Sequence, residues 1–323
     1  MIKDYIKIID VTSSDHHIFY DKHTPKEISV SLFGECNMNC QFCIGNQRHN
    51  IKCPVNFDNI IQLINNEISK TDKHEISVVL YGGELFHDGI KDETFDQYYK
   101  LITNVTEHAT NCSKLISWTI STNLVHKKRE RVLAFLKTVN INSLCSSFDF
   151  KQRFANKKLL DTFIDNVKWY HQHGISLSFG FILFNANIDA FYNNDGLITI
   201  FNWLYSNFPI YFDYYHPTNR DTNVVDEETI GKFLIWLDQH YPNIKTLCDL
   251  RNKNHKTSCP ATFIIDGYAT RCCDFSTIAK QYAIKKQCFS CKYNKDCSHP
   301  CIRIMSNNSN CFVKMYYDYL SKP

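Results

Sequence analysis

The sequence contains no long apolar run. Its first residues, Met1 to Lys7, are charged from the start and lack the apolar core of a secretion signal. No later apolar segment approaches the length that a membrane-spanning helix needs. These absences exclude a secreted protein and a membrane-spanning one, and they predict a cytoplasmic protein without a membrane partner.

A one-sided charge is also missing. Lys and Arg number 36 against 33 Asp and Glu, which gives a formal net charge of +3, and the lysines are scattered. Because a nucleic-acid groove needs a clustered basic surface, nucleic acid is not an expected partner. The 323 residues, 44% of them hydrophobic, are enough for one large domain with a smaller appendage.

Cysteine, by contrast, is abundant. The chain has 15 cysteines, an odd number, and no secretion signal. This combination predicts thiolate ligands in a reducing compartment rather than disulfides, and therefore sensitivity to oxygen. Cys53, Cys112 and Cys145 have no ligand-like partners in the sequence, so they are interpreted as ordinary buried or loop thiols.

Three of the cysteines form a compact triad. Cys36, Cys40 and Cys43 are spaced Cys-x3-Cys-x2-Cys, and Phe42 directly precedes the last. This spacing can hold one four-iron cluster, and three thiolates leave one iron without a protein ligand. An open iron can bind a substrate or cofactor as well as pass electrons, which favours catalysis. The alternative is a structural zinc site, but zinc wants a fourth protein ligand and usually paired Cys-x2-Cys elements.

A Gly-Gly-Glu segment, Gly82 to Glu84, follows a β-branched run at residues 74–80 that predicts a buried strand. Two glycines at the end of a strand allow a ligand to approach the backbone closely. Together with the cysteine triad, this segment resembles the radical S-adenosylmethionine (SAM) enzymes, in which a cysteine triad follows the first strand and Gly-Gly-Glu the second.

The resemblance implies that the triad holds a 4Fe-4S cluster whose open iron is chelated by the amino and carboxylate groups of SAM. It places Phe42, Gly82, Gly83 and Glu84 at the cofactor, with the Glu84 carboxylate helping to hold the SAM ammonium. An external donor such as flavodoxin or ferredoxin would supply the electron that cleaves SAM. The resulting 5'-deoxyadenosyl radical would abstract hydrogen from an unactivated position.

Hydrophobic periodicity predicts alternating strands and helices along most of the chain. The predicted strands are residues 27–33, 74–80, 115–121, 141–148, 175–184 and 210–214. The predicted helices are residues 57–69, 95–108, 132–139, 159–173, 197–208 and 227–240, and Gly174 is the expected C-cap of the fourth. Repeated strand-then-helix units imply a parallel sheet with helices outside. The resemblance makes this α/β unit a partial, six-stranded (β/α)6 TIM-like barrel with its reacting loops at the carboxyl ends of the strands.

Two further strand ends carry polar residues that resemble SAM contacts of the family. The segment ending in Asn123 is similar to Thr-Asn-Gly, and the segment beginning at Ser147 is similar to Ser-x-Asp-Gly. This chain has Leu124 and Phe150 where the family has glycine. Asn123 and Ser147 are expected SAM contacts, with the alternative that they only satisfy backbone groups in turns.

The last quarter of the chain is the densest in cysteine. Its frame consists of Cys259, Cys272, Cys288, Cys291, Cys297, Cys301 and Cys311. Residues 263–268 contain an Asp-Gly turn and predict a hairpin that brings the first two of these cysteines together. The frame resembles the SPASM domain, the auxiliary-cluster extension of radical enzymes that mature peptides and sulfatases. Structural zinc is the alternative for the four cysteines from Cys288 to Cys301.

The SPASM resemblance implies two auxiliary 4Fe-4S clusters, which makes three clusters in all. The first auxiliary set consists of Cys288, Cys291, Cys297 and Cys311. The second set consists of Cys259, Cys272 and Cys301, and it is one ligand short. The gap is closed by Cys273, by Cys248, or by no protein residue, in which case a substrate group would occupy the open iron.

The two residues that directly follow Cys272, which ends the segment Gly267-x4-Cys272, are candidate catalytic residues. Some relatives carry an acidic general base directly after the cysteine that corresponds to Cys272. This chain has Cys273 at that position and Asp274 next to it. Asp274 is therefore a hypothetical proton acceptor.

These observations divide the chain into three parts. Residues 1–26 are an N-terminal extension, residues 27–245 a radical SAM partial barrel, and residues 246–323 a SPASM-like auxiliary cluster domain. The extension is too short for a separate peptide-recognition domain, but a leader peptide could dock on a partner protein.

The resemblance implies a radical SAM enzyme that oxidises or crosslinks a ribosomally made peptide. The runner-up is a radical dehydrogenase of a small molecule such as an amino sugar or alcohol, and no residue decides between the two. A third possibility is a non-catalytic iron-sulfur or zinc scaffold, which leaves the Gly-Gly-Glu segment unexplained.

Overall fold

A computed structural model of the chain describes residues 6–9, 25–40, 42–43, 55–154, 156–193, 196–214, 225–252, 262–265, 268–270, 282–285, 291–293 and 311–322. The strands are β1 (Ile6–Ile9), β2 (Lys26–Ser31), β3 (Glu75–Tyr81), β4 (Leu115–Ser121), β5 (Ser143–Ser147), β6 (Ser176–Leu183), β7 (Ile210–Tyr214), β8 (Thr262–Ile265), β9 (Tyr268–Thr270) and β10 (Tyr282–Lys285). The helices are α1 (Phe57–Lys70), α2 (Asp92–Asn111), α3 (Arg129–Thr138), α4 (Phe150–Arg153), α5 (Lys157–Gln172), α6 (Asn185–Tyr192), α7 (Ile198–Asn207), α8 (Glu227–His240), α9 (Lys245–Arg251) and α11 (Phe312–Leu320).

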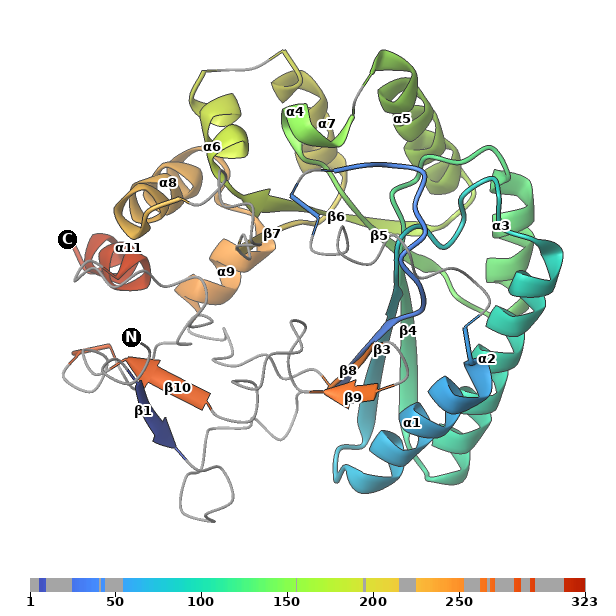
Figure 1. The fold of residues 1–323 in the computed structure, drawn as a ribbon. Helices are drawn as coiled ribbons and strands as arrows, with labels where there is room; N and C mark the ends of the chain where they lie inside the picture. The colour runs from blue at the N-terminus through green and yellow to red at the C-terminus, as the bar shows by residue number, and fades with distance from the viewer. Residues whose placement is uncertain are drawn as a thin grey trace.

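The main sheet is a parallel half-barrel. Its strand order is β7-β6-β5-β4-β3-β2-β8-β9, and every neighbouring pair from β7 to β8 is parallel. Strands β2 to β7 follow one another in the chain with helices between them, and the helices lie on the outside of the curved sheet (Figure 1). The partial α/β barrel predicted from the sequence is confirmed.

Alternating side chains give the sheet an apolar outer face and a polar inner face. In β6, Leu177, Phe179 and Phe181 are buried, and Phe181 packs against Phe201 of α7 with 5.7 Å between ring centroids. Ser178 occupies the intervening position, so it belongs to the opposite face. The core therefore lies between the sheet and its helices, and the inner face is left for polar groups.

Side chains and backbone at the helix ends fix where the helices start and stop. Asn56, Asn156 and Asp226 cap α1, α5 and α8, because each side chain accepts a hydrogen bond from the backbone N–H three residues later. Gly174 follows α5 with a φ of +79°, a left-handed conformation that suits glycine. The predicted end of this helix is confirmed.

The C-terminal quarter of the chain contributes directly to the sheet. The predicted hairpin is confirmed as β8 and β9, which pair antiparallel with Phe263 opposite Thr270. Strand β8 also pairs parallel with β2, with Ile264 opposite Val30, which was not predicted. Helix α11 packs against α8, and β1 pairs antiparallel with β10. In the part of the chain described above, no helix is long and apolar enough to cross a membrane.

Candidate functional site

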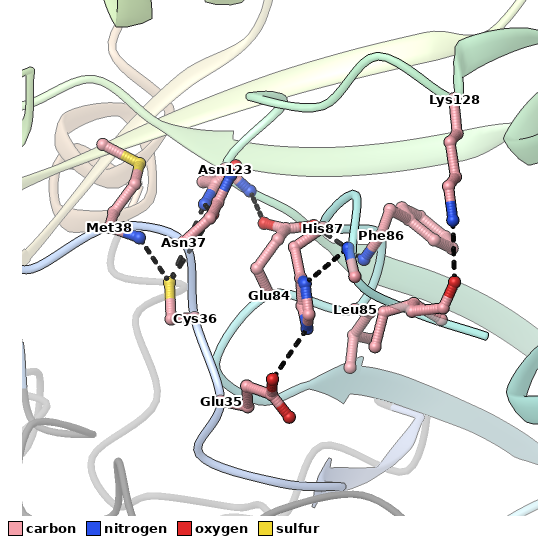
Figure 2. Close-up of polar contacts among 12 residues, drawn as sticks. Glu35, Cys36, Asn37, Met38, Glu84, Leu85, Phe86, His87, Asn123 and Lys128 are labelled. Atoms are coloured by element: carbon pink, nitrogen blue, oxygen red, sulfur yellow. Dashed lines mark hydrogen bonds and ion pairs between the residues drawn. The ribbon is translucent and has the colours of Figure 1, made fainter.

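Three loops meet at the carboxyl edge of the sheet. Because β2, β3 and β4 are parallel neighbours, the loops that follow them lie side by side. Figure 2 shows Cys36, Glu84 and Asn123, one from each loop, gathered in one place. The structure thus brings the predicted cysteine, Gly-Gly-Glu and Asn segments together.

The cysteine loop holds three thiols in different surroundings. Cys40 is buried, whereas Cys36 and Cys43 are half-buried. The Met38 backbone N–H donates to Cys36 Sγ at 3.4 Å, and Asn123 Nδ2 donates to the same sulfur at 3.8 Å. The Cys43 N–H donates to the Cys40 carbonyl at 3.1 Å, which turns the loop back on itself. Cys40 and Cys43 therefore lie on one turn, and Cys36 precedes it in the same loop.

Burial raises the pKa of two of these thiols, Cys36 and Cys40. The pKa of Cys36 rises to about 11, chiefly through burial, and the charges of Glu84, Cys40 and Cys43 add to the shift. Burial also raises the pKa of Cys40, whereas the charge of Arg153 lowers it. Cys36 and Cys40 therefore favour the protonated form without a cation, and iron binding would release their protons. This mutual influence fits a shared iron cluster, although among the described side chains no three His, Cys, Asp or Glu converge on one metal ion.

The two glycines bring the second loop into backbone contact with the first. The Gly83 N–H donates to the Phe33 carbonyl at 2.6 Å, and the Glu84 N–H donates to the Glu35 carbonyl at 2.8 Å. A Cβ atom at Gly83 would lie 1.9 Å from the Glu35 carbonyl oxygen, and one at Gly82 would lie 2.7 Å from the Phe33 carbonyl oxygen. Only glycine allows this contact. The sequence predicted that a ligand approaches these glycines closely. In the structure, the backbone of residues 33–35 makes this close approach.

Glu84 joins the second loop to the third. Its side chain is fully buried, and Oε1 accepts hydrogen bonds from the Phe86 N–H at 3.0 Å and from Thr122 Oγ1 at 2.7 Å. Oε2 accepts from the Asn123 N–H at 2.5 Å. Burial raises the pKa of Glu84, and the three donors oppose that shift. Both oxygens are thus engaged by protein donors, and a contact with the SAM ammonium stays a prediction.

Asn123 joins the third loop to the first. Its Nδ2 donates to Asn37 Oδ1 at 2.7 Å, and its Oδ1 accepts from the Val125 N–H at 2.7 Å. Leu124, which stands where the family has glycine, has a φ of 57°. The backbone therefore keeps the left-handed conformation that glycine would adopt, and Asn166 Nδ2 holds it through the Leu124 carbonyl at 2.9 Å.

Phe42 and a buried ion pair flank the thiols. Phe42 is 4% exposed and stacks on Phe184 at 5.1 Å between ring centroids. The guanidinium of Arg153 lies 5.5 Å from the centre of the Phe42 ring, and Arg153 Nε donates to Asp149 Oδ2 at 3.0 Å. Sequence reasoning missed Arg153. Its only signal was the Asp-x3-Arg spacing, which places the two side chains on the same side of a helical turn.

Ser147 and Phe150 have different surroundings. Ser147 ends β5 opposite Gly180, half-buried at the carboxyl edge of the sheet. Phe150 stands where the Ser-x-Asp-Gly segment of the family has glycine. It is fully buried and packs on Phe191 at 4.9 Å between ring centroids. Its N–H donates to Asn187 Oδ1 at 2.9 Å. Phe150 is therefore a core residue, and the role of Ser147 in SAM binding stays a prediction.

The inner face of the half-barrel carries a polar cluster on β4, β5 and β7. Ser121 and Tyr211 both hydrogen-bond with the Cys145 thiol, whose pKa is raised by burial. Asp213 lies two residues further along β7, and its side chain is exposed to solvent. Cys145, interpreted from the sequence as an ordinary thiol, is thus part of a hydrogen-bonded group.

Two of the predicted auxiliary ligands lie within the described residues. Cys311 is the N-cap of α11, and its pKa is raised chiefly by burial, with a contribution from the charge of Cys291. The other predicted auxiliary residues lie outside the described residues: Cys259, Cys272, Cys273, Asp274, Cys288, Cys297 and Cys301. Cys248, the alternative fourth ligand, lies in α9 and donates to the Pro242 carbonyl at 3.5 Å.

Comparisons with known proteins agree with this geometry. A family model described as a 4Fe-4S single cluster domain matches residues 28–152. No curated protein matches the chain. Among solved structures, native anSMEcpe with bound AdoMet has a TM-score of 0.65 at 13% identity, covering 92% of this chain and 95% of that one.

Two further solved structures contain peptides. The anSMEcpe complex with AdoMet and the Cp18Cys peptide has a TM-score of 0.63 at 13% identity, covering 92% of this chain and 95% of that one. SuiB of Streptococcus suis bound to its precursor peptide SuiA has a TM-score of 0.53 at 14% identity, covering 90% and 70%. The predicted resemblance to radical SAM enzymes is confirmed as a likeness of fold.

Proposed function

We propose that this protein is a radical SAM enzyme that modifies a ribosomally made peptide, with its first cluster on Cys36, Cys40 and Cys43. The observation that carries the proposal is the contact between the three loops at the carboxyl edge of the sheet. The cysteine loop is held by backbone hydrogen bonds to Gly83 and Glu84. A zinc knuckle or an electron-transfer scaffold has no need of this second loop.

When bound, the cluster and SAM supply a 5'-deoxyadenosyl radical that abstracts a hydrogen atom from the substrate. The chain's own residues hold the site in place and keep water out. Glu84 fixes the positions of the Gly-Gly-Glu loop and the Asn123 loop relative to each other. Phe42 and Leu124, which adjoin Cys43 and Asn123 in the sequence, are buried apolar residues, and such residues beside a site help to keep water from a reactive radical.

The substrate would meet the radical at the inner face of the half-barrel. This face presents hydroxyl, thiol and carboxyl groups from Ser121, Cys145, Tyr211 and Asp213. Such groups can orient a peptide backbone or a polar side chain through hydrogen bonds. Asp213 is a second candidate for proton acceptor beside Asp274, because its exposed carboxylate lies on the inner face where the substrate would bind.

A peptide is favoured as substrate because the structures similar to this chain include complexes with peptides. The runner-up is dehydrogenation of an amino sugar or alcohol, which the polar inner face would also accommodate. Two auxiliary clusters on the C-terminal cysteines are part of the proposal, and the proximity of Cys291 to Cys311 supports one of them. A flavodoxin or ferredoxin would be the external electron donor.

Anaerobic reconstitution tests the proposed activity. The protein would be loaded with iron and sulfide, reduced with dithionite and incubated with SAM, and 5'-deoxyadenosine and methionine would be measured. We expect both products from the native protein and a loss of nearly all product with Cys40→Ala, because the cluster needs all three thiolates to stay bound. Cys112→Ala, which changes a half-buried thiol at the end of α2, is the matched control.

The outcomes separate the alternatives. Equal product from the Cys40→Ala variant would overturn the proposal, and tight zinc binding without sulfide would favour the scaffold. Deuterium transfer from a labelled peptide, encoded by a neighbouring reading frame, into 5'-deoxyadenosine would support the peptide substrate. Transfer only from labelled amino sugars or alcohols would favour the runner-up.

A further inference from the structure

Arg153 is a buried cation held firmly beside the cysteine loop. Its side chain is 12% exposed, and its partner Asp149 is fully buried. Asp149 Oδ1 accepts hydrogen bonds from the Ile182 N–H and from Asn187 Nδ2, both at 2.9 Å. Because β6 and α6 hold Asp149 from one side, the guanidinium is fixed on the other.

The guanidinium contacts the cysteine loop at Phe42. It lies 5.5 Å from the centre of the Phe42 ring, and Phe42 is the residue directly before Cys43. Cys40 lies within range of the Arg153 charge. The charges of Cys40 and Cys43 in turn act on Arg153. Because the guanidinium is the member of the ion pair that contacts Phe42, positive charge lies next to the cysteine loop.

Negative charge dominates the remaining surroundings of the loop. The Glu84 carboxylate and the thiol groups of Cys40 and Cys43 lie close enough to Cys36 for their charges to act on it. Reduction of a cluster bound here would add one more negative charge to a half-buried site. A fixed cation nearby lowers the free energy of that added charge, and burial strengthens the effect because solvent screens it less.

We propose that Arg153 is a positioning residue that raises the reduction potential of the cluster on Cys36, Cys40 and Cys43 by holding a permanent positive charge beside it. The inference rests on the proposed function, because it requires that cluster. It concerns the charge and not the shape of the side chain. A lysine at this position should therefore retain most of the effect, and an apolar side chain of similar length should not.

The test is a redox titration of the reconstituted full-length protein without SAM, followed by electron paramagnetic resonance. The signal of this cluster would be identified by its absence in the Cys40→Ala variant. We expect Arg153→Met to decrease the ratio of reduced to oxidised cluster about tenfold at a given ambient potential, which corresponds to about 59 mV for one electron. Arg153→Lys should stay within about threefold of the native ratio.

A second variant guards against misfolding. Arg153→Met leaves Asp149 buried without its cationic partner, so Asp149→Asn combined with Arg153→Met removes both charges and keeps the shape. An unchanged potential in both Met variants, or an equal decrease in Arg153→Lys, would overturn the inference. Loss of the cluster from both the Met and the Lys variants would also overturn the inference. Cluster binding would then depend on the shape of the arginine side chain and not on its charge. Absence of the cluster from the native protein would instead refute the proposed function.

Discussion

At the residue scale, the site depends on side chains that bind protein as well as on those expected to bind a cofactor. Glu84 was predicted from its Gly-Gly-Glu context, but its hydrogen bonds to the third loop were not. The donors Thr122 and Asn123 are distant from Glu84 in the sequence. Leu124 shows the reverse case. Its departure from glycine put the motif in doubt, yet its left-handed φ of 57° preserves the backbone shape.

Replacement of Glu84 by glutamine should destabilise the protein by about 1–3 kcal/mol, because an amide N–H group would face a buried donor where an oxygen now accepts. The free energy of unfolding of the metal-free protein in urea measures this change. Glu35→Gln is the control, since the Glu35 side chain is 44% exposed and only approaches His87 at 3.9 Å. Equal stability of the Glu84→Gln and native proteins would contradict the conclusion that the Glu84 hydrogen bonds hold the second and third loops together.

Buried His126 should make stability fall in mild acid. Its ring is 2% exposed, Nε2 lies 2.8 Å from Tyr170 Oη, and burial lowers its pKa to about 4. Between pH 6.5 and 4 the unfolded chain binds a proton that the native state does not, so stability decreases as the pH falls through this window.

The difference in unfolding free energy between pH 7.5 and pH 5 should shrink by about 2 kcal/mol in His126→Phe. Tyr170→Phe is the matched control, because it removes the same hydrogen bond but keeps the imidazole, and it should retain the native difference. A His126→Phe protein that loses as much stability in acid as the native protein would refute the assignment.

At the scale of elements, periodicity was a good guide to long helices and strands and a poor one to short connections. The bounds of β4, β7 and α8 agree with those predicted from the sequence. The short helices α4 and α6 were missed, because their positions depend on long-range hydrogen bonds such as those of Asn187 with Asp149 and Phe150. A four-residue helix such as α4 carries too little periodicity to be recognised.

The packing of the second loop on the first leaves no room for a side chain at Gly83. We expect Gly83→Ala to lower the free energy of unfolding by about 1–3 kcal/mol, because its methyl group would overlap the Glu35 carbonyl, and to reduce the iron retained after reconstitution. Gly196→Ala is the control, since a Cβ atom there meets nothing within 4 Å. Full stability and full iron content in Gly83→Ala would show that the two loops separate freely.

At the scale of the whole molecule, the sequence identified the half-barrel but not how the C-terminal quarter joins it. The cysteine spacing predicted a separate unit, and its division from the barrel at residue 245 stays a prediction. The pairing of β8 with β2 joins residues that are more than two hundred positions apart, and no local pattern in the sequence indicates such a partner. Most of the predicted auxiliary ligands lie outside the described residues.

The proposed three clusters predict a metal content of about 12 iron and 12 sulfide per chain. The variant with Cys36, Cys40 and Cys43 replaced by alanine should retain about eight of each, because only the first cluster is lost. Replacement of both Cys291 and Cys311, which lie near each other, should also remove about four iron atoms per chain. Chemical analysis of iron and acid-labile sulfide after anaerobic reconstitution measures these values.

A native content of about four iron per chain would contradict the auxiliary clusters while leaving the first cluster intact. One zinc ion in place of the missing iron would favour the structural alternative for the C-terminal cysteines.

The pairing of β8 with β2 also has a consequence for biosynthesis. As the polypeptide leaves the ribosome, β2 can pair with β3 early, but its other edge has no partner until residues 262–265 emerge much later. During that interval the nascent chain exposes unpaired backbone groups next to the future site, and such edges promote aggregation. Chaperone protection and the timing of iron delivery should therefore matter most before residues 262–265 have left the ribosome.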